Sequence, residues 1–392
     1  LKGKNAALSI QRVIKGLGCI AKAHYLMFLP VPEWVWMDLH SLYTLSVKIG
    51  KDTTKVPDET CVFSKTSSVL DSYRQILLLS LAEPSGMMQK EIQLVYKFIE
   101  KINGYVRFEN KPVDGQKSQC VVFPDEDRPP FWTAEDKRQV DASLVYLDFS
   151  RLYRTVAHKT RFVSESEARF SSIHPSNKKI EKLPVELIEY LNGSWHGLEL
   201  KGTPFFTDRL NRYFCIGLNA THNLQSLFEN HQEKETEFRA ESSSDTTLSC
   251  KSLEEGVICI GSLVSFRKVD MPEHKRSLGV VNRISMSRAE GVLQFGVRAV
   301  ALQAHAVSYL ELDARNVDEM QKALIYGKKE EDGEKSYLII ESFIIKDGDI
   351  IRLFMKDEDF PIILRDRKNI GLGYWQFECR RIEEWEAVKM KR

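Results

Sequence analysis

The amino-acid sequence predicts a multidomain α+β protein, with an N-terminal antiparallel helical domain followed by an antiparallel β-barrel. Two observations support this fold class. Apolar residues recur at helical spacing through residues 6–102, whereas short apolar runs separated by turn-forming and charged segments occupy residues 261–298. At 392 residues, the chain is long enough for two or three domains, each with its own core.

Four amphipathic helices are expected in the first domain, residues 1–107, which we interpret as a domain of helical hairpins. The apolar stripes cover residues 6–28, 34–49, 69–81 and 92–102. Gly50, Pro84 and Gly104 mark the ends of the last three. Packed as antiparallel pairs, these helices are expected to bury Trp34, Tyr43, Tyr73, Leu77, Val95 and Ile99.

Residues 108–202 are expected to connect the helical domain to the barrel. Their first part is polar and rich in proline, with one short apolar run at 121–123 that predicts a strand. Apolar residues at helical spacing predict a further helix over 183–192, which ends at Asn192–Gly193.

The barrel is expected to span residues 203–312. A strand is predicted over 213–218, and a further strand or turn follows it through Ala220, His222 and Leu224. Val264 and Phe266 alternate after a glycine, and the apolar runs at 278–284 and 292–297 predict two more strands.

Residues 313–392 are expected to form a short C-terminal extension of one helix and several strands. The helix is predicted over 316–326. The strands are predicted over 336–345, 350–355 and 362–364. These strands either complete the barrel or form a small appended sheet.

The composition is that of an ordinary soluble protein, with 43% hydrophobic and 28% charged residues. The net charge of +1 gives no overall attraction to nucleic acid or anionic membranes, and no apolar run approaches the roughly 20 residues of a membrane span. Seven dispersed cysteines without a CxxC pair indicate reduced thiols, hence a cytoplasmic protein. Because the first residue is Leu, we expect the native start of the protein to be missing.

No sequence motif of a known catalytic site is present. HExxH, GxSxG and GxxxxGK[ST] are absent, and Gly371 and Gly373 are expected to form a plain turn. His24 and His40 lie on apolar helical faces without an accompanying pattern of metal ligands. We therefore predict no catalytic residue, no metal and no cofactor, and a protein that is not an enzyme.

The succession GSLVSF, LGVVNRI and FGVR in residues 261–298 resembles the second half of a PilZ domain, the bacterial receptor module for cyclic di-GMP. The resemblance covers residues 203–312 and implies a six-stranded antiparallel barrel. It also implies two nucleotide-contacting motifs: RxxxR in the loop before the first strand, and D/NxSxxG between early strands. The planar fork of arginine can bind a phosphate, or the O6/N7 edge of guanine, through two hydrogen bonds.

The matching positions give the expected ligand-binding residues. Arg209 and Arg212 precede the first strand with the spacing RxxR, one residue shorter than in the family. In FRAESSSDTTLS, Ser243 takes the place of the motif's Ser in one register, where Glu and Thr replace the other two motif residues. A shifted register starts at Asp245. The resemblance thus implies a site of Arg209, Arg212, Ser243 and Asp245, with both arginines exposed.

The resemblance implies a bacterial cyclic di-GMP effector that passes nucleotide binding to a protein partner through the helical domain. An alternative is a PilZ-fold adaptor that acts through protein contacts without nucleotide. A third hypothesis is a nucleic-acid-binding barrel, which the near-zero net charge disfavours. It would use a C-terminal basic cluster interleaved with Tyr374 and Trp375. The residues of this cluster are Arg365, Arg367, Lys368, Arg380 and Arg381. A solvated surface and a phosphate-facing patch are the other interpretations of this cluster.

Overall fold

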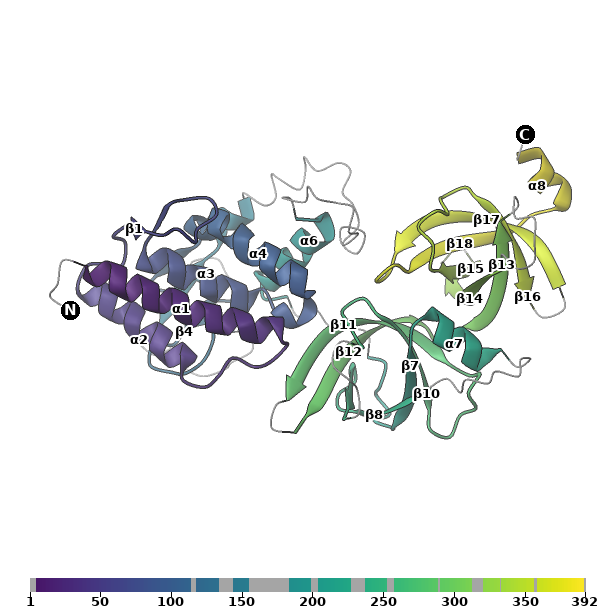
Figure 1. Ribbon diagram of the computed structural model, residues 1–392, viewed down its shortest axis with the longest axis horizontal. Coiled ribbons are helices and arrows are strands. Elements are labelled where there is room, and N and C mark those ends of the chain that lie inside the picture. The colour runs from purple at the N-terminus through teal and green to yellow at the C-terminus, as the bar shows by residue number, and fades with distance from the viewer. Residues whose placement is uncertain are drawn as a thin grey trace. The chain divides into compact units, whose positions relative to one another are not determined.

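The structure is a computed structural model (Figure 1). It describes residues 5–113, 118–133, 144–154, 183–198, 204–226, 237–251, 257–287, 290–311, 320–331, 333–355 and 358–390. These residues fall into two compact units, one formed by the described residues up to 198 and the other by those from 204 onward. The first is mainly helical and the second mainly antiparallel strands, which confirms the α+β fold class.

The predicted helices are present in the first unit. They are α1 (Ala6–Leu26), α2 (Val35–Lys48), α3 (Val69–Leu81), α4 (Gln89–Ile102) and α6 (Val185–Ser194). A small antiparallel sheet packs with them in the order β3-β6-β4-β5, and its strands are β3 (Arg107–Glu109), β4 (Cys120–Val122), β5 (Phe131–Trp132) and β6 (Val145–Asp148). A two-stranded ribbon of β1 (Val56–Pro57) and β2 (Thr66–Ser67) precedes α3. In the part of the chain that the structure describes, no helix is long and apolar enough to cross a membrane.

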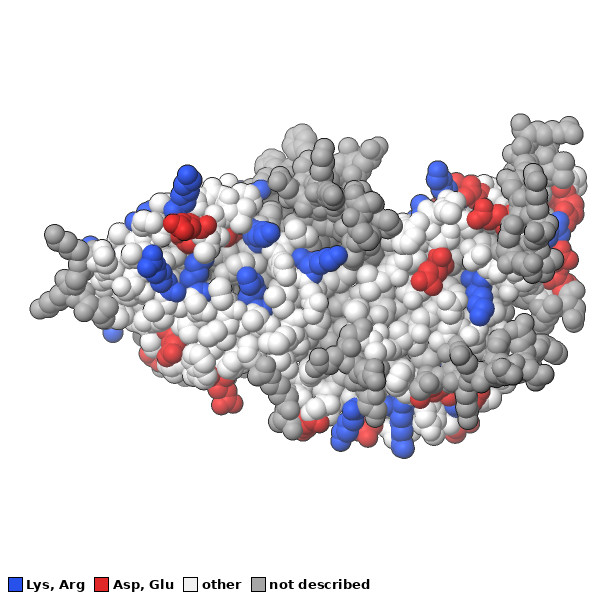
Figure 2. All heavy atoms as spheres, in the orientation of Figure 1, with Lys and Arg blue, Asp and Glu red and all other residues white. Residues whose placement is uncertain are grey.

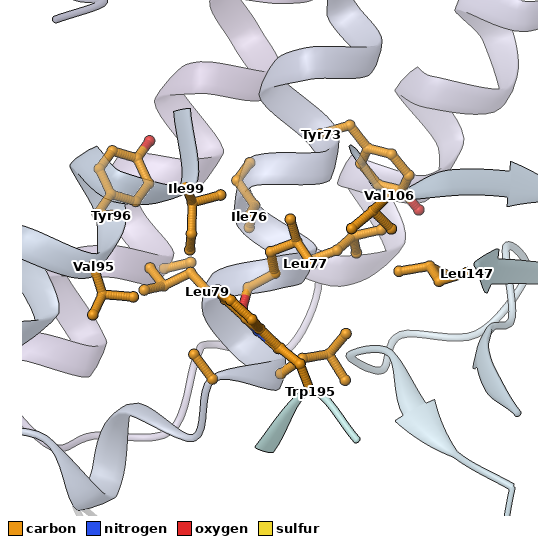
Figure 3. Packing of buried hydrophobic residues seen from close by; sticks show 14 of the residues in the cluster. Tyr73, Ile76, Leu77, Leu79, Val95, Tyr96, Ile99, Val106, Leu147 and Trp195 are labelled. Atoms are coloured by element: carbon orange, nitrogen blue, oxygen red, sulfur yellow. The ribbon is translucent and has the colours of Figure 1, made fainter. Parts of the chain in front are cut away.

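Helix α3 lies at the centre of this unit, in contact with α1, α2 and α4. Ser68 caps its N-terminus: the Ser68 hydroxyl accepts the Asp71 backbone N–H at 3.1 Å, and the Asp71 carboxylate accepts the Ser68 N–H at 2.8 Å. In Figure 3, side chains of α3, α4 and β6 converge on one apolar cluster together with Trp195. The Trp195 indole N–H donates to the Leu78 carbonyl at 3.1 Å, which ties the segment after α6 to α3.

The expected core residues are largely confirmed. Tyr73, Leu77, Val95 and Ile99 are buried, and the half-buried Tyr43 stacks on Tyr73 with ring centroids 4.3 Å apart. The expectation for Trp34 is wrong, because this residue is 50% exposed. Trp34 precedes the first turn of α2 in a left-handed conformation, with φ of 83°, and its N–H is bound by the Asp127 carboxylate. A residue outside the helix does not follow the helical stripe.

His40 is a fully buried structural residue of α2. Its Nε2 donates to the Arg128 carbonyl at 2.9 Å, so in the neutral ring Nδ1 accepts from the Tyr73 hydroxyl at 2.6 Å. Burial lowers the pKa of His40 below 6.5, although the Arg128 carbonyl and Asp127 act in the opposite direction. The imidazole therefore remains neutral and links α2, α3 and the loop before β5.

The second unit begins with a closed six-stranded antiparallel barrel, which we call barrel 1. Its strands are β7 (Arg212–Ile216), β8 (Phe238–Ser242), β9 (Thr247–Cys250), β10 (Leu263–Lys268), β11 (Ser277–Ser287) and β12 (Val292–Ala301). Pairing of β7 with β10 closes the barrel, and the buried rings of Phe214 and Phe295 lie 5.1 Å apart. The strands predicted within residues 261–298 are thus confirmed.

The strand or turn expected after β7 is instead the helix α7 (Leu218–Gln225), which starts after Gly217 with φ of 93°.

A second closed barrel, barrel 2, follows directly. Its strands are β13 (His305–Glu311), β14 (Gln321–Glu330), β15 (Gly333–Ile340), β16 (Ile350–Met355), β17 (Glu358–Asn369) and β18 (Trp375–Arg381), and α8 (Glu384–Met390) comes after them. The C-terminal strands therefore neither complete barrel 1 nor form an appended sheet. The expected helix at 316–326 is also wrong where it can be compared: residues 321–326 belong to β14, which pairs with β13 and β15, while 312–319 lie outside the described residues.

Within this unit the two barrels share a buried apolar cluster. Leu263 and Leu278 of barrel 1 pack with Leu324 and Ile339 of barrel 2. The Gly371–Gly373 turn is part of this junction, because the Leu372 N–H donates to the Gly261 carbonyl at 2.8 Å. A Cβ on Gly371 would lie 2.3 Å from that carbonyl oxygen, so only glycine fits.

Replacing Leu77 by Ala should lower the free energy of unfolding of the full chain by about 2–5 kcal/mol, because Leu77 is fully buried at the centre of the helical core. Chemical denaturation measures this change. Exposed Val47→Ala on α2 provides a control of similar chemistry. A loss below about 0.5 kcal/mol for Leu77→Ala would contradict the packing described.

Acidification should destabilise the helical unit through His40. Below pH 6.5 the unfolded chain takes up a proton at His40, whereas the folded chain does not, because burial lowers the pKa of His40 in the folded state. The free energy of unfolding therefore falls as the pH decreases from about 7 to 5.5. The decrease is at most about 1.4 kcal/mol per pH unit. The variant His40→Gln cannot titrate here. Its stability should change less over this pH range, and an unchanged slope would show that His40 is not the cause.

Candidate functional site

The loop that leads into barrel 1 lies against the turn between β8 and β9. The backbone N–H groups of Phe205 and Phe206 both donate to the Asp245 carbonyl at 2.7 Å. We call residues 204–211 the lead-in loop and residues 243–246 the β8–β9 turn. These segments carry Arg209, Ser243 and Asp245, and Arg212 follows the lead-in loop as the first residue of β7, so the fold brings the residues that the sequence singled out to one part of barrel 1.

Arg209 reaches from the lead-in loop to this turn. Its guanidinium donates to the Ser243 carbonyl at 2.8 Å and lies 2.9 Å from the Asp245 carboxylate. The side chain remains 52% exposed, as expected, and the residue adopts a left-handed conformation with φ of 55°. An exposed ion pair of this kind contributes only about 0–1 kcal/mol, so the guanidinium can exchange Asp245 for another anion at small cost.

Arg212 differs from the expectation, because it is buried, with 4% of the residue exposed. Its guanidinium donates to the Asp208 carboxylate at 2.7 Å and to the Ser242 hydroxyl at 2.9 Å, and it lies over the ring of Phe206 at 4.8 Å. All of these partners belong to the lead-in loop or to β8. Arg212 therefore holds the loop on the barrel.

Asp208 joins two cations. Its carboxylate lies 2.9 Å from the Lys268 ammonium as well as 2.7 Å from Arg212. Burial acts to raise the pKa of Asp208, but the hydrogen bonds from Arg212 and Lys268 outweigh it and lower that pKa to about 2. The carboxylate is thus ionised at neutral pH.

Ser243 shapes the β8–β9 turn. It is exposed, its hydroxyl donates to the Thr247 carbonyl at 3.2 Å, and its own carbonyl accepts from Arg209. Asp245 offers both its carbonyl, to the lead-in loop, and its carboxylate, to Arg209. Both residues therefore lie where a ligand held by Arg209 would meet them.

A cleft of about 460 Å³ opens beside Arg209. Three segments contribute a cation to it: Arg209 from the lead-in loop, Arg239 from β8 and Lys268 from the end of β10. Arg239 is exposed and forms no ion pair with another described residue. Figure 2 shows Lys and Arg side chains projecting beside acidic ones at the lower edge of barrel 1, near β8 and β10.

The sequence reasoning missed Arg239 and Lys268. Residues 239–241 alternate exposed, buried and exposed along β8, so Arg239 lies on the outer face that carries Glu241. The same alternation of polar and apolar residues in the sequence could have indicated that Arg239 faces outward. The position of Lys268 could not be found in this way, because it depends on the pairing of β10 with β7, which places Lys268 opposite Arg212.

The C-terminal basic cluster lies on a different barrel. Its residues belong to β17 and β18 of barrel 2, where the Arg367 guanidinium lies 3.6 Å from the ring centre of Trp375 and that of Arg381 lies 4.2 Å from the ring centre of Phe360. Two of its cations are therefore occupied with aromatic rings, whereas Arg365 and Arg380 are exposed.

Two sequence comparisons relate this chain to cyclic di-GMP receptors. Residues 2–113 match the family described as the N-terminal domain of the cyclic-di-GMP receptor FimW. The chain is also 26% identical over 217 residues to the cyclic-di-GMP receptor FimW of Pseudomonas aeruginosa. That alignment covers 55% of this chain and 34% of the relative, so the chain matches about a third of the length of that protein.

Solved structures of MrkH from K. pneumonia are also similar to part of the chain. The apo structure is 9% identical and covers 47% of this chain and 84% of MrkH, with a TM-score of 0.16. The MrkH–c-di-GMP complex is 5% identical, and the alignment covers 48% of this chain and 86% of MrkH, with a TM-score of 0.17. Scores this low do not establish a shared fold.

The two arginines of the lead-in loop and β7 should respond differently to substitution. Arg212→Met should lower the free energy of unfolding of barrel 1 by about 1–3 kcal/mol, because it removes a buried guanidinium and its hydrogen bonds to Asp208 and Ser242. Arg209→Met should change it by less than about 0.5 kcal/mol, because Arg209 is exposed. Urea denaturation of both variants measures the difference, and equal effects would contradict the distinct roles described.

Proposed function

We propose that this chain is a bacterial, cytoplasmic cyclic di-GMP effector, with a PilZ-like barrel 1 that binds the nucleotide and no catalytic activity. The observation that carries the proposal is the convergence of Arg209, Arg239 and Lys268 on one cleft beside the β8–β9 turn. A closed six-stranded antiparallel barrel preceded by an arginine-bearing loop supports the PilZ-like assignment. The similarity to FimW, a cyclic-di-GMP receptor, supports the choice of ligand.

The chemistry of the cleft fits a ligand with two phosphates and two guanines. Arg239 is a cation with no partner among the described residues, and Arg209 can exchange its exposed pair with Asp245 for a phosphate. The Asp245 carboxylate, once released, can accept from the N–H donors of a guanine, and Ser243 lies beside it. In this arrangement Arg212 positions the loop through its ion pair with Asp208.

We propose further that the helical unit docks a protein partner and so transmits nucleotide binding. Val13 and Ile20 of α1 and Met27 directly after it recur every seven residues and are exposed, with Gly16 on the same face. The charged residues of α1 are all basic. An apolar stripe beside basic side chains suits an acidic amphipathic helix.

The exposed face of α1 also favours a second candidate function. A nucleotide-independent adaptor needs only such a docking face, and the carboxylate of Asp245 would have to be displaced from Arg209 before a nucleotide could bind. Whether the chain binds cyclic di-GMP at all decides between the two functions.

Calorimetric titration of the full chain with cyclic di-GMP tests the proposal. The unmodified protein should bind, and the double variant Arg209→Ala/Arg239→Ala should bind about a hundredfold more weakly or not at all, since each lost charge-assisted hydrogen bond costs about 1.5–3 kcal/mol. The variant should keep its thermal unfolding transition, because both side chains are exposed.

A matched control removes two exposed cations from barrel 2, Arg365→Ala/Arg380→Ala, and should bind like the unmodified protein. The opposite pattern, with binding lost only in this control, would move the site to barrel 2. No binding by the unmodified chain at millimolar nucleotide would favour the adaptor.

A further inference from the structure

A second cleft adjoins the first on barrel 1. It has a volume of about 270 Å³, and Lys268 lines both clefts. Its walls come from the lead-in loop, from β10 and the connection 269–276 to β11, and from residues 302–303 after β12. Asp208 and Arg212 line this cleft as well, but its other walls lie outside the motif positions that the sequence singled out.

The floor of this cleft carries excess positive charge. The Arg276 side chain is fully buried; its Nη1 donates to the Glu237 carboxylate at 2.5 Å and its Nε to the Ser265 hydroxyl at 2.7 Å. Arg267 donates to the same carboxylate at 2.5 and 2.9 Å. Burial acts to raise the pKa of Glu237, but the hydrogen bonds from Arg267 and Arg276 outweigh it and lower that pKa. The single ionised carboxylate of Glu237 therefore compensates the charges of two guanidinium groups, those of Arg267 and Arg276.

The rim of the cleft is apolar and exposed. Leu302 is 82% exposed and Met271 is 40% exposed, and the rings of Phe205 and Phe266 form the wall behind them. Lys275 also lines the cleft, is exposed, and forms no ion pair with another described residue. Exposed apolar side chains around cationic donors suit a flat ring that has hydrogen-bond acceptors on one edge.

Guanine is such a ring. Its O6 and N7 atoms are both acceptors on one edge, whereas adenine presents N7 beside an N6 amino donor. The ammonium of lysine has donors only, so it favours guanine over adenine at this edge. A phosphate alone would have no use for the apolar rim.

We propose that the second cleft holds one guanine of the cyclic dinucleotide whose phosphates lie in the first cleft, and that Lys275 is a specificity-determining residue. Lys275 donates to the O6/N7 edge, Met271 and Leu302 cover the face of the ring, and Lys268 contacts the ligand where the two clefts meet. This inference rests on the proposed function, because it concerns a further part of the same ligand.

The test compares cyclic di-GMP with cyclic di-AMP by calorimetry on the full chain. The unmodified protein should prefer cyclic di-GMP. Lys275→Met keeps the length of the side chain and removes its charge; it should weaken cyclic di-GMP binding about tenfold and leave cyclic di-AMP binding within about twofold. Lys251→Met, on an exposed lysine that lines neither cleft, is the matched control and should change neither affinity.

A second variant tests the apolar rim separately from charge. Met271→Ala/Leu302→Ala should weaken cyclic di-GMP binding about tenfold while its salt dependence stays that of the unmodified protein, whereas Arg209→Ala/Arg239→Ala should flatten the salt dependence. Equal losses of both nucleotides in Lys275→Met, or no loss in either the Lys275 or the rim variant, would overturn the inference while the proposed function stands. Failure of the unmodified chain to bind either nucleotide would overturn both.

Discussion

The arrangement of barrel 1 depends on the pairing of Arg212 with Asp208. Arg212 is the first residue of β7 and is buried against β8, while Asp208 belongs to the lead-in loop. The two charges compensate each other in a place where a lone guanidinium would be costly. The pair thus fixes the loop to the barrel, and the stacking of Arg212 on Phe206 adds to it. With the loop fixed, Arg209 reaches the β8–β9 turn and the two clefts share a common wall.

The cations of this region therefore fall into two groups: the buried ones have a structural role, and the exposed ones are available to a ligand. Arg212, Arg267 and Arg276 are buried or nearly so and are held by Asp208 or Glu237. Arg209, Arg239 and Lys275 are exposed, and only the first has an ionic partner among the described residues. An exposed pair is worth about 0–1 kcal/mol, whereas breaking a buried one costs several times more. A ligand can recruit the exposed group at little cost, and the buried group keeps the clefts in shape.

The local patterns of the sequence predicted the local structure well. The helical stripes anticipated α1, α2, α3, α4 and α6, and alternation anticipated β10, β11 and β12, because burial of one face determines these periods. The wrong expectations concern residues whose structure depends on contacts with segments distant in the sequence. The segment Gln321–Tyr326 is apolar enough for either a helix or a strand, and pairing with β13 and β15 made it a strand of an unexpected second barrel. Arg212 was expected to be exposed, but β8 and the lead-in loop fold over it and bury it. Lys268 joined the candidate site only through the pairing of β10 with β7, whereas alternation along β8 already places Arg239 on the outer face.

Hydrogen–deuterium exchange of the full chain, with and without cyclic di-GMP, tests the central claim most directly, because it locates the ligand without altering any residue. The nucleotide should slow exchange in the lead-in loop, in residues 238–247 and in residues 267–278, since these segments line the two clefts or contact Arg209. Protection confined to β17 and β18 around Arg365–Arg381, or no protection in barrel 1 at saturating nucleotide, would contradict it.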